Sequence, residues 1–109
     1  MADTKIELDG ELLVVAAQGV SVDGDWMSLR THRDCFGSVI PLQIRITGTC
    51  TVTVEARNTP NDTPFVSFTG GASTNHNLLP WKQFRVRVSG ITPNVDVRVS
   101  CPYPLRKYV

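Results

Sequence analysis

The feature that most constrains this chain is a strict alternation of apolar and polar residues in its central and C-terminal parts. Apolar residues occupy every second position of 42–46, 50–57, 84–88 and 95–101. Because successive side chains of a β-strand point to opposite faces of a sheet, this period predicts strands with one buried and one exposed face. We interpret the four strands as two hairpins, 42–57 and 84–101.

Less regular patterns predict four further strands, at 5–8, 12–17, 26–30 and 65–69. The range 12–17 is apolar without alternation, which fits a strand covered on both faces or a short helix, and its β-branched residues favour the strand. The seven prolines and eight glycines interrupt the chain too often for long helices. The dipeptides Asp9-Gly10 and Asp23-Gly24 are typical of turns, because glycine accepts a positive φ.

Short strands separated by turns predict an all-β fold, an antiparallel β-sandwich of jelly-roll or immunoglobulin-like type with about 7–8 short strands. A chain of 109 residues has the size of one domain. We expect residues 1–11 to form an N-terminal arm or edge strand, 12–101 the sandwich, and 102–109 an extended tail. Prolines at 102 and 104 should prevent that tail from continuing a ladder, and the polar ranges 58–64 and 70–77 should be exposed loops.

The charges are unevenly distributed along the chain. Residues 1–40 carry three basic and seven acidic side chains, a net of −4, whereas residues 41–109 carry eight basic and three acidic ones, a net of +5. The overall charge of +1 creates no general attraction for nucleic acid or an anionic membrane. We expect these charges to meet across strands within one subunit, and pairing with a neighbouring copy is the alternative.

No residue pattern indicates catalysis or a cofactor. The G-x-S-x-G motif of many hydrolases is missing, and so is a glycine-rich phosphate loop. The two histidines, His32 and His76, lie in polar, turn-like stretches and are expected to be surface residues without a catalytic role. The chain is therefore predicted not to be an enzyme.

Metal binding is also not expected. His32 and Cys35 form one H-x-x-C pair, but zinc sites usually take ligands from two such pairs. Cys50 and Cys101 share the inward phase of their strands, so we expect small buried apolar residues there. Asp23-Gly24-Asp25 resembles a fragment of a calcium loop, yet it lacks the further oxygen ligands of an EF-hand, and a turn is the favoured interpretation.

Two kinds of binding surface are suggested by the side chains. Several arginines fall at outward positions without interleaved aromatic residues, which favours a solvated or subunit-facing surface over direct nucleic-acid binding: Arg45, Arg57, Arg85, Arg87 and Arg98. Trp26 and Trp81 could stack on a sugar ring or close the ends of the sandwich. Aromatic residues make up only 7% of the chain, so few can be spared from the core.

The start of the chain lacks the basic and apolar regions of a signal peptide, and no apolar run approaches the roughly 20 residues of a membrane-spanning helix. We therefore expect synthesis in a cytoplasm and no membrane partner. The odd number of cysteines, three, agrees with this expectation, because it cannot form a closed disulfide framework.

Two motifs resemble those of small β-sandwich virion proteins of tailed bacteriophages. Residues 44–55 read IRITGTCTVTVE, and residues 80–90 read PWKQFRVRVSG, followed by VDVRV at 95–99. In that family a G-T-x-T-V-x-V-E segment and a W-x-x-F/Y-R-V-R-V-S-G segment recur in one domain. The resemblance covers roughly residues 40–100.

The resemblance implies a virion structural protein, made in the host cytoplasm. It favours a capsid decoration (cement) protein that binds the major capsid protein; a neck or tail subunit is the alternative, and a carbohydrate-binding sandwich is a second one. A homo-oligomer is expected, with a trimer favoured. The candidate partner-contacting residues are Arg85, Arg87 and Arg98 together with the tail residues Tyr103, Leu105, Arg106, Lys107 and Tyr108. Removing 102–109 is expected to weaken assembly without unfolding the domain.

Overall fold

The computed structural model describes residues 4–8, 11–18, 23–29, 39–79, 81–90, 95–103 and 105–107. Within these ranges the chain forms ten strands: β1 (Lys5–Leu8), β2 (Glu11–Gln18), β3 (Met27–Leu29), β4 (Ile40–Thr47), β5 (Thr51–Arg57), β6 (Phe65–Gly70), β7 (Thr74–Leu78), β8 (Gln83–Ser89), β9 (Val95–Ser100) and β10 (Leu105–Lys107). Among these residues, no segment forms a helix long and apolar enough to cross a membrane.

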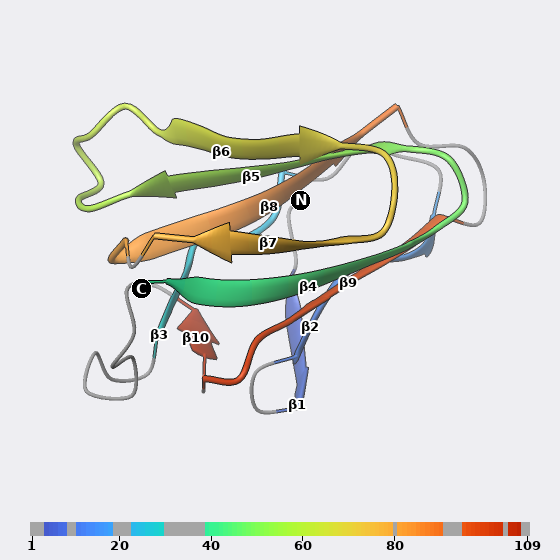
Figure 1. Ribbon diagram of the computed structural model, residues 1–109, viewed down its shortest axis with the longest axis horizontal. Helices are drawn as coiled ribbons and strands as arrows, with labels where there is room; N and C mark the ends of the chain where they lie inside the picture. Colours follow the sequence, from blue (N-terminus) through green and yellow to red (C-terminus); the bar gives the residue numbers. More distant parts are fainter. Residues whose placement is uncertain are drawn as a thin grey trace.

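The strands form two antiparallel sheets that face each other (Figure 1). Sheet A has the order β1-β2-β9-β4-β7, and sheet B has the order β10-β3-β8-β5-β6. The predicted all-β antiparallel sandwich is therefore confirmed. From β2 to β9 the chain changes sheet at every connection except β5–β6, which is the double Greek-key arrangement of a jelly roll and not an immunoglobulin-like order.

Both predicted hairpins are wrong, although all four of their strands exist. β4 pairs with β9 and β7 in sheet A, whereas β5 pairs with β8 and β6 in sheet B. Likewise β8 and β9 belong to opposite sheets. Alternation shows which side chains of a strand are buried, but two strands can present those side chains to the same core from opposite sheets. The turns at Gly48 and Gly90, both with positive φ (99° and 61°), are followed by the other sheet.

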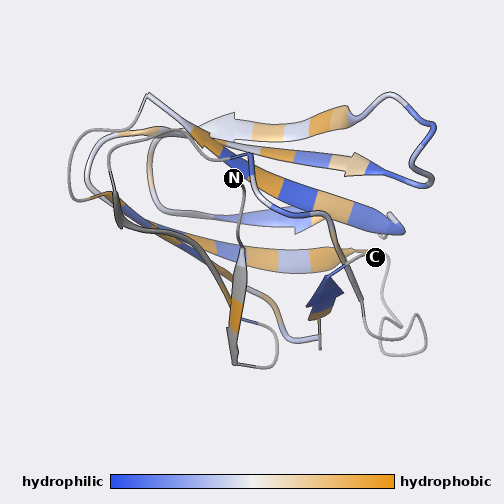
Figure 2. Cartoon of the chain, turned by 180° about the vertical axis from the view of Figure 1, so that it is seen from behind, coloured by the Kyte–Doolittle hydropathy of each residue, from blue (hydrophilic) through white to orange (hydrophobic). Residues whose placement is uncertain are grey.

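The core between the sheets consists of the predicted inward positions. All three valines at the inward positions of β9, Val95, Val97 and Val99, are fully buried, as are Val52 and Val54 of β5. Figure 2 shows the resulting bands of apolar and polar residues along the strands. Cys50 is buried as expected, and Cys101 is half-buried against the same core. Complete burial of each such valine contributes roughly 1.5–3 kcal/mol before the entropy cost of ordering the chain.

The strand β7 lies in a region that the sequence pattern assigns to a loop. The range 70–77 contains β7, which pairs with β4 from Ile40↔Leu78 to Ile44↔Thr74. Its side chains are largely polar because β7 is an edge strand, so the pattern has little apolar content. The apolar range 12–17 is the strand β2 and not a helix.

The tail does not continue the ladder of β9, which ends at Ser100, and Leu105–Lys107 is extended, as predicted. The sequence did not indicate that this segment is a strand: it is β10, in the other sheet from β9, and it pairs with β3 from Leu105↔Leu29 to Lys107↔Met27. At the other end of the chain, β1 is an edge strand of sheet A.

The residues before β3 run close beside β8. Gly24 has a φ of 58°, and a Cβ atom at this position would overlap the carbonyl oxygen of Val86. A glycine is therefore required for two reasons, the left-handed backbone and the close approach to the neighbouring strand. This contact places Asp23 and Trp26 next to the outward arginines of β8.

Candidate interaction surfaces

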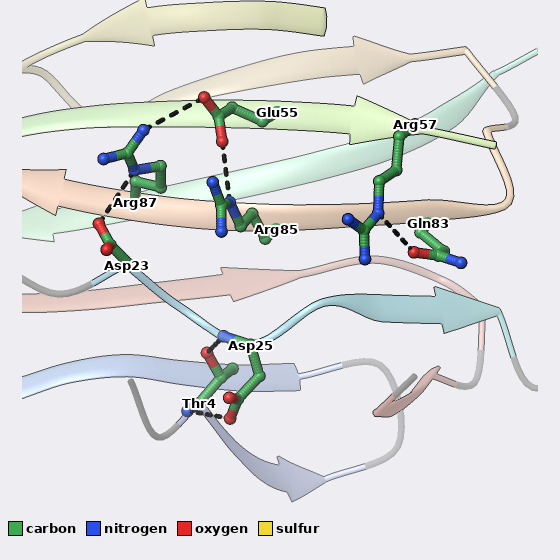
Figure 3. Close-up of polar contacts among 8 residues, drawn as sticks. All are labelled: Thr4, Asp23, Asp25, Glu55, Arg57, Gln83, Arg85 and Arg87. Carbon is green, nitrogen blue, oxygen red and sulfur yellow. Dashed lines mark hydrogen bonds and ion pairs between the residues drawn. The ribbon is translucent and has the colours of Figure 1, made fainter. Parts of the chain in front are cut away.

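Arg85 and Arg87, two of the predicted partner-contacting residues, are engaged within the chain itself. They point outward from β8 and share the carboxylate of Glu55 on β5 (Figure 3): Arg85 Nε donates to Oε1 at 2.8 Å and Arg87 donates to Oε2 at 3.3 Å. Arg87 also donates to Asp23 at 3.1 Å. Burial lowers the pKa of the Arg87 guanidinium, but its hydrogen bonds and attraction to Asp23 and Glu55 outweigh this and raise the pKa overall.

Glu55 is the centre of this network, since its residue is only 7% exposed although it lies on the outer face of the sheet. A carboxylate this deeply covered is stable only when its charge is compensated, and the two arginines provide that compensation. The network therefore stabilises the β5–β8 pair and keeps Arg85 within the fold. Arg87 retains 43% of its side-chain exposure, so its guanidinium is still accessible from outside.

Arg98, the third predicted arginine, lies on the outer face of sheet A directly opposite Arg45. Like charges at opposite positions repel each other. Here acids offset them: Glu11 forms an ion pair with Arg45 at 3.0 Å and approaches Arg98 at 4.0 Å, and Asp96 accepts from Arg98 at 3.2 Å. These pairs are partly exposed, so each contributes at most about 1 kcal/mol.

Among the residues that the structure describes, opposite charges from the two parts of the chain meet within the subunit. Acids of the first forty residues contact bases of the remainder in four ion pairs: Glu11–Arg45, Glu11–Arg98, Asp23–Arg87 and Asp25–Lys107. The expectation that these charges meet inside one subunit is confirmed for these residues.

The tail residues are placed by their position in and before β10. Leu105 is 1% exposed and belongs to the core, so its proposed role as a surface anchor is wrong. Tyr103 is partly buried against the core, and Arg106 Nε donates to Ser28 Oγ at 3.3 Å. Lys107 lies 3.3 Å from Asp25. Tyr108 lies outside the described residues.

Asp25 joins both ends of the chain to the segment before β3. Its carboxylate accepts from the Thr4 backbone N–H at 2.8 Å, while its own N–H donates to Thr4 Oγ1 at 2.9 Å (Figure 3). Because Lys107 contacts the same carboxylate, the N-terminal segment and β10 are both tied to Asp25. Asp23-Gly24-Asp25 thus has a structural role, and it lies beside β8 without forming the predicted hairpin turn, since β2 and β3 belong to different sheets.

Trp26 is covered by two guanidinium groups. The guanidinium carbon of Arg57 lies 3.8 Å from the indole centroid and that of Arg85 lies 4.7 Å away, distances typical of cation–π contacts. Arg57 also donates to Gln83, which is 3% exposed, at 2.7 Å. A sugar ring stacking on Trp26 would have to compete with these arginines.

His76 lies between the edges of the two sheets. It projects from β7 and shares a 2.7 Å hydrogen bond with Ser67 on β6, and its ring lies 5.3 Å from that of Phe68. Burial lowers the pKa of the imidazole. His76 therefore lies in a strand and not in the predicted turn, and it is half-buried; His32 lies outside the described residues.

In the described part of the chain, the large apolar side chains with the most exposed surface lie on β6 and directly after β7. Phe65 is 56% exposed, Val66 50% and Leu79 57%. The Phe65 ring stacks on Trp81, with centroids 5.8 Å apart and an angle of 23° between the planes. We call Phe65, Val66, Leu79 and Trp81 the apolar edge patch. No sequence pattern indicated a role for Phe65, Val66 or Leu79. Because adjacent side chains of a regular strand point to opposite faces of the sheet, Phe65 and Val66 could not both be expected to face the core.

A shallow polar hollow of about 210 Å³ lies on sheet A, lined by Gln43, Ile44, Arg45, Ser73, Thr74 and Asn75. The Ser73 hydroxyl already bonds to the backbone of Ile46: it accepts from the N–H at 2.8 Å and donates to the C=O at 3.3 Å. The hollow offers amide, hydroxyl and guanidinium groups but no nucleophile beside a base. It can bind a small polar molecule only weakly, since it is open to solvent.

The described residues hold no group of three or more histidine, cysteine or acidic side chains able to bind a metal ion, and Cys35 lies outside them. Cys50 and Cys101 are free thiols. Burial raises the pKa of the Cys50 thiol, and Cys101 Sγ donates to the Tyr103 carbonyl at 3.2 Å. Both therefore behave as packing residues. Comparison of the chain with protein-family models, curated proteins and solved structures finds no match.

Proposed function

We propose that this chain is a non-enzymatic structural subunit of a virus particle, a capsid decoration protein that binds the major capsid protein and stabilises the particle. The neck or tail of a phage is the alternative location. The resemblance of residues 44–55 and 80–99 to small phage virion proteins supports this class. The jelly roll agrees with it, because this fold is common in viral capsid proteins, although lectins and cupins share it.

The observation that carries the proposal is the apolar edge patch. Several surface charges form ion pairs inside the chain, whereas Phe65, Val66 and Leu79 leave half or more of their surface exposed, and Phe65 stacks on Trp81. Exposed apolar and aromatic residues grouped in this way are typical of protein–protein contacts. A protein that acts by assembly needs such a surface and requires no catalytic group.

Arg87 and Arg106 are further candidates for contact with the particle. Arg87 is 43% exposed at the side chain despite its two acidic partners, and Arg106 is exposed with Ser28 as its hydrogen-bond partner. Both lie on the outer side of sheet B. They could add charge-dependent steering to a contact whose affinity comes from apolar burial.

The proposal is tested by expressing the chain together with the major capsid protein encoded in the same genome and sedimenting the assembled capsids. We expect the chain to cosediment at a fixed ratio and to raise the temperature at which the capsids dissociate. The decoration role is wrong if the chain stays in the supernatant. The virion class as a whole is wrong if the coding sequence lies among genes without capsid or tail proteins and if the chain binds no virion protein.

A carbohydrate-binding module is the second candidate, favoured by the stacked pair Phe65–Trp81. An exposed phenylalanine ring beside a tryptophan can form a platform for a sugar ring. Tryptophan fluorescence during titration with a panel of glycans tests this function. A saturable change that the variant Phe65→Ala abolishes would support it, and an unchanged spectrum across the panel would remove it.

A further inference from the structure

The outer edge of sheet B is the least protected of the four sheet edges in the described chain. β10 has three residues, two of them cationic, and β1 contains Lys5 and Glu7. β7 has five residues and is largely polar. β6 is six residues long, contains no charged residue and carries Phe65 and Val66. Short length, charge and β-bulges are among the means by which proteins block pairing at an exposed edge. β6 is neither short nor charged, and its protection is limited to the register shift in its pairing with β5.

β6 also offers unpaired backbone groups. It pairs with β5 on one side and ends the order of sheet B on the other (Figure 1). N–H and C=O groups that point away from β5 are satisfied best by another strand, while the neighbouring apolar side chains are satisfied by burial. The required partner is therefore a β-strand with uncharged, partly apolar side chains.

The sequence of β6 makes it complementary to itself. An antiparallel pairing that overlaps all six residues sets Val66 opposite Thr69 of the partner subunit and Phe65 opposite Gly70 of the partner subunit. Across β5, Val66 and Thr69 match the outward residues Glu55 and Thr53, and Phe65 and Gly70 match the inward residues Ala56 and Val52. Each pair thus lies on one face, as an antiparallel ladder requires.

This match depends on the register shift near Ser67. In a regular strand residues 66 and 69 lie on opposite faces, because side chains alternate with a period of two. The shift between the Val66 and Phe68 pairings with β5 returns Thr69 to the face of Val66. The bulge, which would otherwise only disturb an edge, therefore allows β6 to pair with the β6 of a second copy about a twofold axis.

We propose that β6 is the interface between two copies of this chain, which pair antiparallel about a twofold axis and join their B sheets into one sheet. The inference rests on the proposed function only for the claim that the chain assembles. It replaces the expected trimer with an isologous dimer, since a twofold axis relates the two edges. No like charges meet, because β6 carries none.

Sedimentation equilibrium of the full chain tests the interface, with two matched lysine variants. Val66→Lys places a charge on the β6 edge, and Asn77→Lys places one on the exposed face of β7, the edge strand of the other sheet. We expect a dimer for the wild type and for Asn77→Lys, and a dissociation constant at least about tenfold higher for Val66→Lys. Raising the NaCl concentration from about 50 to about 500 mM should leave the wild-type dimer unchanged, because its interface is uncharged.

A cysteine pair tests the register. Val66→Cys combined with Thr69→Cys should form disulfide-linked dimers on mild oxidation, because directly opposed Cβ atoms lie roughly 4.5–5.5 Å apart. Val66→Cys alone and the wild-type chain, with its native cysteines, should remain unlinked. A linked single variant or an unlinked double variant would overturn this register.

The interface is wrong if the wild type is a monomer at all concentrations, if it is a trimer, or if both lysine variants dissociate equally. Capsid cosedimentation of the same proteins separates this result from the proposed function. A wild-type dimer that binds no capsids contradicts the proposed function alone. A wild-type monomer that binds capsids contradicts the β6 interface alone.

Discussion

Replacing Gly24 by alanine should destabilise the fold more than the same change at Gly90. Both glycines have a left-handed backbone, with φ of 58° and 61°. Alanine costs about 1–2 kcal/mol in this conformation, whatever its surroundings. Because no atom lies within 4 Å of a Cβ at Gly90, Gly90→Ala should lower the free energy of unfolding by this backbone cost alone, about 1–2 kcal/mol.

Gly24→Ala adds a steric conflict with the backbone of Val86, and backbone cannot turn away as a flexible side chain can. Relief requires moving the 23–26 segment from β8, which weakens the Asp23–Arg87 ion pair and the paired hydrogen bonds of Asp25 with Thr4. Overpacking of this kind costs about 1–3 kcal/mol. We expect a total loss of about 2–4 kcal/mol for Gly24→Ala.

Urea unfolding followed by tryptophan fluorescence measures both variants, since Trp26 lies in the segment that must move. With a slope of about 2 kcal/mol per molar urea, the midpoint should fall by about 1–2 M for Gly24→Ala and by only about 0.5–1 M for Gly90→Ala. Equal midpoints for the two variants would refute the argument that the close approach to β8, and not the φ angle alone, requires a glycine.

Three further changes test the network, the histidine and the last strand. Glu55→Gln should lower the free energy of unfolding by about 1–2 kcal/mol, because Arg85 and Arg87 lose the carboxylate that they share. Glu11→Gln, whose partners are more exposed, should lower it by less than about 1 kcal/mol, and an equal loss for both variants in urea unfolding contradicts the central role of Glu55. Burial lowers the pKa of His76 in the folded chain, so as the pH falls through and below about 6.5 the unfolded chain binds a proton first and the free energy of unfolding should decrease. The variant His76→Gln should flatten this dependence of stability on pH, and an unchanged dependence would refute the role of His76. Leu105→Ala should cost about 2–4 kcal/mol by thermal and urea unfolding, and a neutral result would show that β10 is dispensable to the core.

The Leu105 prediction changes how a tail deletion should be interpreted. Removal of residues 102–109 takes away β10 together with a core leucine and the Lys107 contact to Asp25. Such a deletion would therefore reduce the stability of the fold itself. Loss of assembly after this deletion says nothing about the interface, whereas Val66→Lys changes an exposed side chain only.

The sequence by itself determined the fold class and the identity of most buried positions. Alternation in 42–46, 50–57, 84–88 and 95–101 depends only on each strand's own geometry, so it identified the residues that face the core, including Cys50. It also indicated that opposite charges would meet inside the subunit, because the two halves of the chain carry opposite net charges.

Only the tertiary structure decided which strands are neighbours. A period of two is the same whether consecutive strands form a hairpin or cross to the opposite sheet. It could therefore not show that β4 and β5, or β8 and β9, lie in opposite sheets. Edge strands such as β7 have one solvated side and a polar sequence, and therefore resemble loops. The exposure of Phe65 and Val66 likewise depends on β6 having no strand beyond it in sheet B, a property of strand order that no local pattern contains.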